Sequence, residues 1–305
     1  AAHYARTAHS TAQIVDIDRH GHQISGLDLS GPSRFEGAVM TMGGDVLERR
    51  HVDRPEVPEG EAVHALVLEL ARELESLSTR PLLGVGIATP GVVRPDGSVH
   101  SAPNLGWTTH PLEARLRAEL DLPVMVRNDA NAAVLAEYTF GASAPDLMLV
   151  RIGRGVGAGL ITGGEPLLGS RYAAGEIGHV VVGTDHGPLC PCGRHGCLEA
   201  WVNAPRLEEL IAANPDATTD VLRDAGARLA IGVAPIVAAL DLSEVVLAGP
   251  PSLLDGEFVR SATETLHART LEGVFADVSI RRTHLDDIVL RGAAVMVLSG
   301  QLGVS

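Results

Sequence analysis

The chain has 305 residues, 45% hydrophobic and 20% charged, a balance typical of a globular protein large enough for two lobes. Its net charge of −14 opposes contact with a phosphate backbone, so the chain alone is expected to bind DNA poorly. No apolar run reaches the roughly 18 residues that a membrane span needs, and residues 1–10 lack the apolar core of a signal peptide.

The hydrophobic pattern predicts a similar order of strands and helices twice along the chain. The first series has strands at 24–29, 35–42 and 46–52, a helix at 61–77, a strand at 82–88, a helix at 111–120, a strand at 124–126 and a helix at 130–140. The second has strands at 147–152 and 158–162, helices at 198–201, 206–213 and 220–240, a strand at 245–248, a helix at 261–271, a strand at 278–281 and a helix at 286–298. Two strand-rich openings, each followed by helices and strands, predict two related α/β lobes.

The cysteines form a single cluster, Cys190, Cys192 and Cys197. An odd, clustered set argues against a disulfide framework and favours a reduced, cytoplasmic protein. His179 precedes Cys190 by ten intervening residues and completes a Cys3His set that suits tetrahedral Zn²⁺. Four protein ligands leave no open position, so we predict a structural zinc ion.

Two further features of the cluster loop bear on this prediction: alternative ligands and glycines. His186 and His195 are rival fourth ligands. Gly193 and Gly196 supply the backbone freedom that a tight loop around an ion requires.

Five segments follow one family pattern in order. The longest runs from Gly178 and His179 through the cysteine cluster to Glu199, and the others are residues 102–107, 128–132, 155–159 and 175–179. Together they span most of the chain from about Ile24, and they resemble the ROK family (repressor, open reading frame, kinase). This resemblance implies an α/β, actin-like ATPase (ribonuclease H-like) two-lobed fold with a structural zinc loop.

The resemblance also implies a division of the chain. We expect an N-terminal α/β lobe formed by residues 24–127 with 287–305, and a C-terminal α/β lobe with the zinc site at 128–286. Residues 1–23 fit a connector that follows a winged helix-turn-helix domain.

A pyranose-binding set follows from the same resemblance: Asn104, Asn128, Asp129, Glu176, His179 and Glu199. Carboxylates and amides can meet the paired hydroxyls of a sugar. His179 would place one ring nitrogen on zinc and the other toward the sugar. In kinases of the family, the residue matching Asp129 is the general base that takes the proton of the attacked hydroxyl as the γ-phosphoryl of Mg-ATP arrives.

The first nucleotide segment departs from the family pattern. Family kinases have Asp, a hydrophobic residue, Gly, Gly and Thr here, whereas this chain has residues 28–32 as Asp28, Leu29, Ser30, Gly31 and Pro32. Ser30 replaces a glycine, and Pro32 has no N–H to offer a phosphate oxygen.

Two further nucleotide segments are altered. The second phosphate loop keeps Gly153, Gly155 and Gly157 but carries Arg154 in place of Thr, and its charge remains able to meet a phosphate. The adenosine segment continues from Gly249 into two prolines, where successive glycines are usual.

Altered nucleotide segments beside intact sugar segments favour the effector-binding domain of a sugar-responsive transcriptional regulator. Its ligand would be a sugar or sugar phosphate, its assembly a homodimer or homotetramer, and its DNA contact would come only from an N-terminal domain upstream of Ala1. The alternatives are an ATP-dependent kinase for a hexose or N-acetyl amino sugar, with Asp129 as base, and a scaffold with neither activity. The sequence does not name the sugar.

Overall fold

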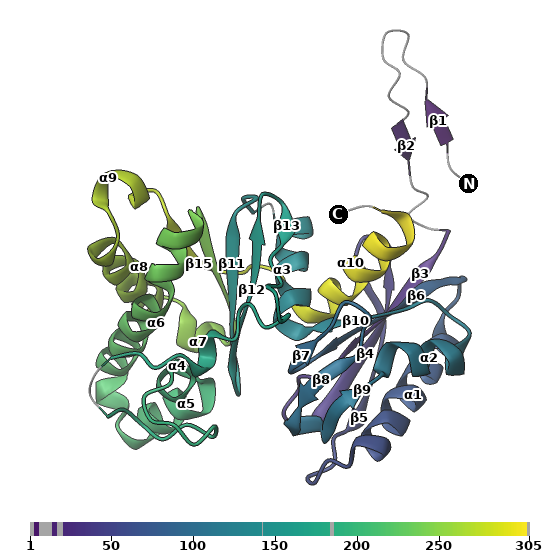
Figure 1. Cartoon of the computed structure of the whole chain (residues 1–305), viewed down its shortest axis with the longest axis horizontal. Coiled ribbons are helices and arrows are strands. Elements are labelled where there is room, and N and C mark those ends of the chain that lie inside the picture. The colour runs from purple at the N-terminus through teal and green to yellow at the C-terminus, as the bar shows by residue number, and fades with distance from the viewer. Residues whose placement is uncertain (1–2, 6–13, 17–20, 142, 184–185, 304–305) are drawn as a thin grey trace. The chain divides into compact units, whose positions relative to one another are not determined.

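The computed structural model describes residues 3–5, 14–16, 21–141, 143–183 and 186–303. The chain forms two compact units (Figure 1): unit 1 comprises Ala1–Asp129 and Val289–Ser305, and unit 2 comprises Ala130–Ile288. Most of the predicted connector at 1–23 lies outside the described residues. Within it, β1 (His3–Ala5) pairs antiparallel with β2 (Ile14–Asp16).

The central sheet of unit 1 has the strand order β10-β6-β3-β4-β5. Strands β3, β4 and β5 form an antiparallel meander, and β6 and β10 continue the sheet in parallel with β3. These strands are β3 (Gln23–Asp28), β4 (Arg34–Thr41), β5 (Val46–Asp53), β6 (Leu82–Thr89) and β10 (Val124–Asn128). The predicted meander is therefore confirmed.

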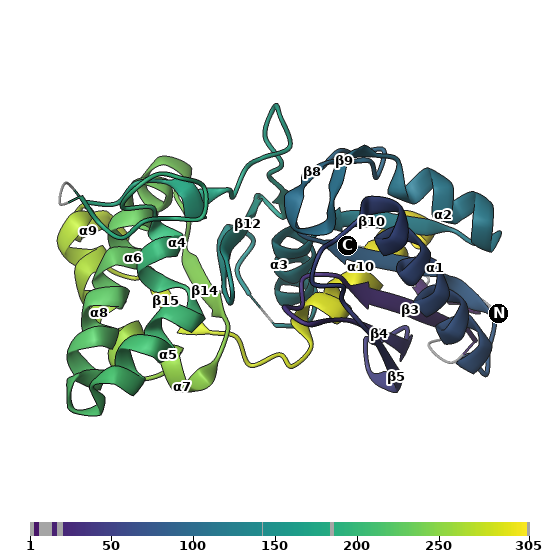
Figure 2. The same cartoon turned by 90° about the horizontal axis from the view of Figure 1, so that it is seen from below.

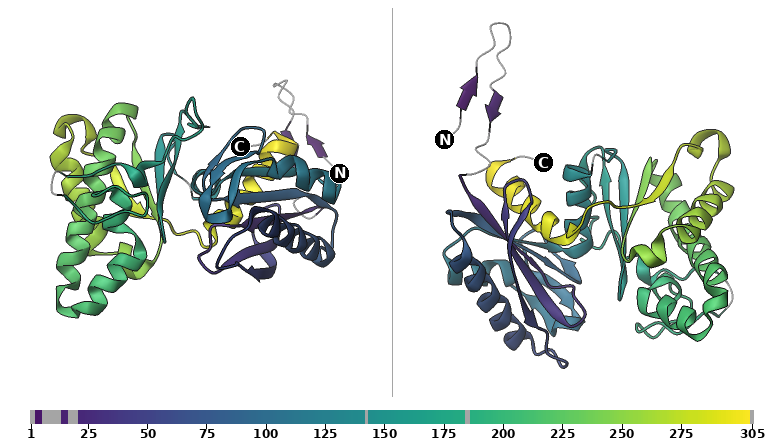
Figure 3. Two further views of the ribbon diagram at one scale, coloured as in Figure 1. Left: turned by 60° about the horizontal axis from the view of Figure 1, so that its bottom comes forward. Right: turned by 180° about the vertical axis from the view of Figure 1, so that it is seen from behind.

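Helices cover both faces of this sheet (Figures 1 and 3). On one face, α1 (Gly60–Leu77) and α2 (Leu112–Leu120) pack on a cluster that includes Leu27 and Phe35. On the other, α10 (Ile288–Leu302) packs on a cluster that includes Ile24 and Met40. The two-residue period of the strands thus separates two apolar sets.

Glycines allow α10 to approach the central strands closely. A Cβ added to Gly86 of β6 would collide with the backbone of Ala293 in α10, and one added to Gly26 of β3 would lie 3.1 Å from the Leu290 carbonyl of α10. At Gly86 the backbones of α10 and β6 therefore pack without an intervening side chain.

A small three-stranded sheet in unit 1 was not predicted. It consists of β7 (Val92–Val93), β8 (Val99–Ala102) and β9 (Trp107–His110), in that order. The short helix η1 (Pro103–Leu105) joins β8 to β9 and carries Asn104. Strands this short lack a readable hydrophobic period, so the pattern missed them.

Unit 2 repeats the strand arrangement of unit 1. Its sheet has the order β13-β12-β11-β14-β15, in which β11, β12 and β13 form an antiparallel meander and β14 and β15 extend it in parallel with β11. The strands are β11 (Leu147–Ile152), β12 (Val156–Thr162), β13 (Glu165–Pro166), β14 (Glu244–Ala248) and β15 (Ser279–Arg282). The prediction of two related α/β lobes agrees with this shared order.

Helix α3 (Asp129–Phe140) lies on one face of the second sheet, and α4, α5, α6 and α8 lie on the other (Figure 2). Gly159 of β12 has no room for a side chain beside Ala130 and Val134, which brings α3 close to the sheet. The remaining helices are α4 (Leu198–Val202), α5 (Ala204–Ala213), α6 (Thr218–Leu240), α7 (Pro251–Leu254), α8 (Glu257–Arg269) and α9 (Glu272–Phe275), with short helices η2 (Ile177–His179) and η3 (Pro215–Ala217).

The prediction of a helix at 261–271 places both of its ends too far toward the C-terminus, since the observed helix is Glu257–Arg269. The observed α8 begins at Glu257, directly after Gly256 with φ 75°, and buries Phe258 in its first turn. Two helices, α7 and α9, were not predicted, because four residues are too few for a helical period. Within the described ranges, no helix has the length and apolar content that a membrane crossing requires.

A buried ionic network ties α3 to the edge of the second sheet. Glu137 is fully buried, and its carboxylate accepts hydrogen bonds from Arg281 Nη2 at 2.8 Å and Thr283 Oγ1 at 2.5 Å. Arg281 also donates to Glu244 Oε1 at 2.6 Å. These partners offset the cost of burying the Glu137 charge, and Arg281 thereby ties α3 to β15.

Substitution of Gly86 by Ala should destabilise the fold by about 1–3 kcal/mol, because the new methyl group overpacks the contact with α10. Thermal unfolding measured by circular dichroism would show a lower midpoint. The matched control is Gly273→Ala, since nothing lies within 4 Å of a Cβ at that position. Equal midpoints for the two variants would contradict the close packing of α10 on β6.

Candidate functional site

The predicted metal ligands converge in unit 2. The ligand atoms of His179, Cys190, Cys192 and Cys197 all lie within 4.8 Å of one another. Cys190 Sγ is 3.6 Å from His179 Nδ1, and the Sγ atoms of Cys192 and Cys197 are 3.6 Å apart. Three sulfurs and one imidazole nitrogen at this spacing match the donor set of a four-coordinate zinc site.

Backbone bonds hold the loop that presents these ligands. Gly193 (φ 86°) and Gly196 (φ 76°) adopt left-handed conformations, as the need for chain reversal predicts. The Cys190 N–H donates to the Arg194 carbonyl at 2.8 Å. Neither rival histidine belongs to the four-residue group, and His195 Nδ1 lies 3.0 Å from the Gly187 carbonyl instead.

The thiols differ in acidity when no metal is bound. Burial raises the pKa of Cys190 to about 12 and raises the pKa of Cys197. Hydrogen bonds from the Arg194 backbone and side chain lower the pKa of the exposed Cys192 to about 6. A cation that binds thiolates would therefore have to displace protons from the two buried sulfurs.

Glu199 connects this cluster to the second phosphate loop. Its Oε1 lies 3.9 Å from Cys190 Sγ, and its Oε2 accepts a hydrogen bond from the Val156 N–H at 3.0 Å. His179 uses Nδ1 toward Cys190, which leaves Nε2 for a second partner. The structure thus brings two predicted sugar residues, His179 and Glu199, to one group of cysteines.

The third predicted sugar residue of unit 2, Glu176, is exposed and precedes η2. This turn packs tightly on β12, because a Cβ on Gly175 or Gly178 would collide with the carbonyls of Ala158 and Val156.

In unit 1 the predicted sugar residues lie on two segments. Asn128 ends β10 and donates from Nδ2 to the Gly91 carbonyl at 3.0 Å, and Asp129 begins α3 directly after it. Asn104 is exposed on η1, and its carbonyl accepts a hydrogen bond from Arg54 Nη2 at 2.6 Å. Arg54 was not predicted, because no local pattern joins residues 50 positions apart.

The first phosphate loop, residues 28–33, forms a closed turn. The backbone N–H and the hydroxyl of Ser30 both donate to Asp28 Oδ1, at 2.8 and 2.6 Å. The turn is tight, since a Cβ on Gly31 would collide with the Arg34 carbonyl. The serine that replaces a glycine therefore engages the aspartate of its own loop.

The other two nucleotide segments also differ from a set of free backbone donors. In the second phosphate loop, residues 153–157, the Gly153 N–H donates to the Gly155 carbonyl at 3.0 Å, and Glu199 accepts from Val156. In the adenosine segment, Pro251 is the first residue of α7, so the N-terminus of this helix lacks one N–H donor.

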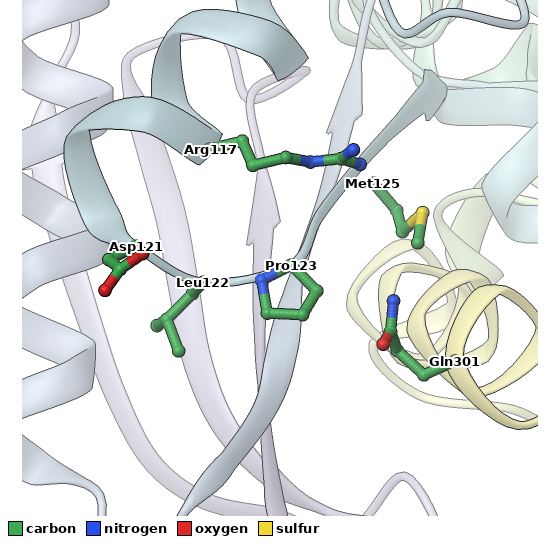
Figure 4. Close-up of a pocket in the computed structure, with 6 residues that line it drawn as sticks. All are labelled: Arg117, Asp121, Leu122, Pro123, Met125 and Gln301. Atoms are coloured by element: carbon green, nitrogen blue, oxygen red, sulfur yellow. The ribbon is translucent and has the colours of Figure 1, made fainter.

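A hollow of about 380 Å³ on unit 1 contains none of the predicted sugar residues. It lies between the end of α2 and the last turn of α10, and is lined by Arg117, Asp121, Leu122, Pro123, Met125 and Gln301 (Figure 4).

The chain is similar to proteins of two kinds, transcriptional regulators and sugar kinases. It is 35% identical over 185 residues to a glucokinase of Halalkalibacterium halodurans, a match that covers 59% of this chain and only 56% of that protein. It is 28% identical to a putative xylose repressor of Caldicellulosiruptor sp., over 95% of this chain and 81% of the relative. The crystal structure of a ROK family transcriptional regulator, a homologue of the E. coli MLC protein, has a TM-score of 0.83 at 21% identity and covers 94% of this chain and 80% of its own.

The family model described as the ROK family matches residues 24–299. This range includes both sheets, the cysteine cluster and every predicted sugar residue. The predicted resemblance is thereby confirmed, and the chain belongs to the ROK family, with the α/β fold that its sugar kinases and regulators share.

Proposed function

We propose that this chain is the sugar-binding domain of a transcriptional regulator and that it does not transfer phosphate. Two considerations support the proposal: the chemistry of the three nucleotide segments, and the similarity to a putative repressor along nearly the whole chain. The sugar would be the signal, and its binding energy would shift the regulator between two states.

The observation that carries the proposal is the closed turn at residues 28–33. Phosphate binding requires backbone N–H groups that point outward and are open to an anion. Here the Ser30 N–H and hydroxyl both donate hydrogen bonds to Asp28, and Pro32 has no N–H. A nucleotide would have to break both bonds and would meet a proline where a donor is needed.

The second loop supports the same conclusion. The Glu199 carboxylate accepts the Val156 N–H, so a negative charge lies against this loop. A γ-phosphate at the same place would be repelled and would compete for one donor. The proline at the first position of α7 removes a further donor.

We propose that the residues that bind the sugar are Asn104, Asn128, Asp129, Glu176, His179 and Glu199. Amides and carboxylates of this kind offer both donors and acceptors to ring hydroxyls. In this proposal the Asp129 carboxylate accepts a hydrogen bond from a sugar hydroxyl, and no proton is transferred.

The four-residue cluster is proposed to hold a structural Zn²⁺, because its donors fit the ion in type, number and spacing. Its ligands would fix the ring of His179 and, through Cys190, the neighbourhood of Glu199. We further propose a homodimer or homotetramer, and DNA contact through a domain N-terminal to these residues, since a net charge of −14 disfavours contact by this chain itself.

A kinase is the second candidate function, because Asp129 and the glycines of the second loop are present and a glucokinase is among the relatives. In that case Asp129 would be the general base and Mg-ATP the phosphoryl donor.

Incubation with Mg-ATP and a panel of glucose, xylose, N-acetylglucosamine and N-acetylmannosamine should give no sugar-dependent release of ADP. Isothermal titration calorimetry with the same sugars and no nucleotide should show binding of at least one. Sugar-dependent turnover that Asp129→Asn abolishes would reject the proposal in favour of the kinase. Binding of neither sugar nor nucleotide would favour a scaffold.

Removal of the metal should weaken sugar binding. We expect one zinc per chain by mass spectrometry, and loss of it in Cys197→Ser, with sugar affinity reduced about 10-fold or more because His179 loses its fixed orientation. The matched control is His195→Ala, a neighbouring loop histidine outside the donor group, which should keep both zinc and affinity. Unchanged sugar affinity in zinc-free protein would count against the coupling.

A further inference from the structure

The guanidinium of Arg54 ties the segment that carries Asn104 to the first phosphate loop. Arg54 follows β5, and its guanidinium donates from Nη2 to the Asn104 carbonyl at 2.6 Å and from Nη1 to the Gly31 carbonyl at 3.4 Å. One planar group therefore bridges the first phosphate loop and the sugar loop, residues 102–107. A guanidinium suits this task because its donors point in fixed, divergent directions.

The backbone of Arg54 belongs to the same junction. Its N–H donates to the Ser33 carbonyl at 2.9 Å, so the residue is anchored on the turn from which its side chain reaches across. That turn is already closed by the Ser30 to Asp28 bonds. The bridge thus has one rigid end at residues 28–33 and one end on Asn104.

The C-terminal end of the sugar loop packs against the start of α1. The Trp107 indole Nε1 donates to the Gly60 carbonyl at 2.8 Å, and its ring stacks on His110 with centroids 4.9 Å apart. A Cβ on Gly60 would approach the Gly106 carbonyl at 2.6 Å. Trp107 fixes the C-terminal end of the loop, whereas Arg54 contacts the main chain at Asn104 itself.

We infer that Arg54 is a positioning residue of the sugar site: it fixes Asn104 for sugar binding by tying its carbonyl to the turn that replaces a phosphate-binding loop. This inference rests on the proposed sugar function. It assigns a task to residues 28–33 in a chain that does not use them for a nucleotide, because the closed turn supplies the fixed end of the bridge.

The bridge predicts that charge alone cannot replace arginine. Arg54→Lys keeps the positive charge, but one ammonium on a flexible stem does not reproduce the planar fork that reaches two carbonyls. Arg54→Ala removes both bonds. Both variants should bind the sugar that the wild-type protein prefers in the four-sugar panel about 10-fold more weakly, the loss expected for one bond from a charged donor.

Arg50→Ala is the matched control. Arg50 lies on β5, and its guanidinium pairs with Glu73 and Glu48 rather than with the sugar loop. Its removal should leave sugar affinity unchanged in calorimetry. Two readouts separate positioning from general stability. Methylguanidinium should restore the sugar affinity of Arg54→Ala and should leave the affinities of Arg50→Ala and the wild type unchanged. Hydrogen exchange of the 102–107 amides should accelerate in Arg54→Ala and Arg54→Lys only.

The outcomes are distinct. Failure of the wild-type protein to bind any sugar of the panel overturns the proposed function and this inference with it. Sugar binding that is equal in wild type, Arg54→Ala and Arg54→Lys overturns this inference alone. Full affinity in Arg54→Lys would show that positive charge, and not the bridge, is what the site requires.

Discussion

A hydrogen-bonding group that is already engaged within the protein is not available to a ligand without cost, and this constraint governs the loops of this chain. Asp28 is bonded by both the N–H and the hydroxyl of Ser30, and Glu199 is bonded by the N–H of Val156. A ligand that displaces such a bond gains only the difference between the new hydrogen bond and the one that is lost.

The cysteine cluster lies in a loop of a different part of the fold. The segment between η2 and α4 has little regular structure, and its loop is exposed at Cys192 and Leu189. Aromatic residues make up only 3% of the chain, so large apolar anchors are scarce. A metal ion held by the four convergent donors would cross-link this loop locally.

Both units place a helix on a sheet through glycine, and both sheets have the same strand order. The close approach of α10 and α3 leaves the loops at the strand ends as the variable part of each unit. Chemistry in such a fold is determined by these loops, so a kinase and a sensor can share one scaffold. In this chain a serine, an arginine and three prolines at those positions distinguish it from the kinase pattern.

The sequence by itself indicated the family, the longer strands and helices and the four clustered donor residues, because these depend on local periodicity and on short spacings. Gly193 and Gly196 were recognisable for the same reason. The sequence missed the sheet β7–β9 and the helices α7 and α9, which are too short to show a period. Only the tertiary structure decided which group each loop atom meets. The Arg54 bridge to Asn104, the engagement of Val156 by Glu199 and the Glu137 network with Arg281 join residues 43 to 144 positions apart. Such pairs depend on how the chain packs, and a one-dimensional pattern contains no signal for them.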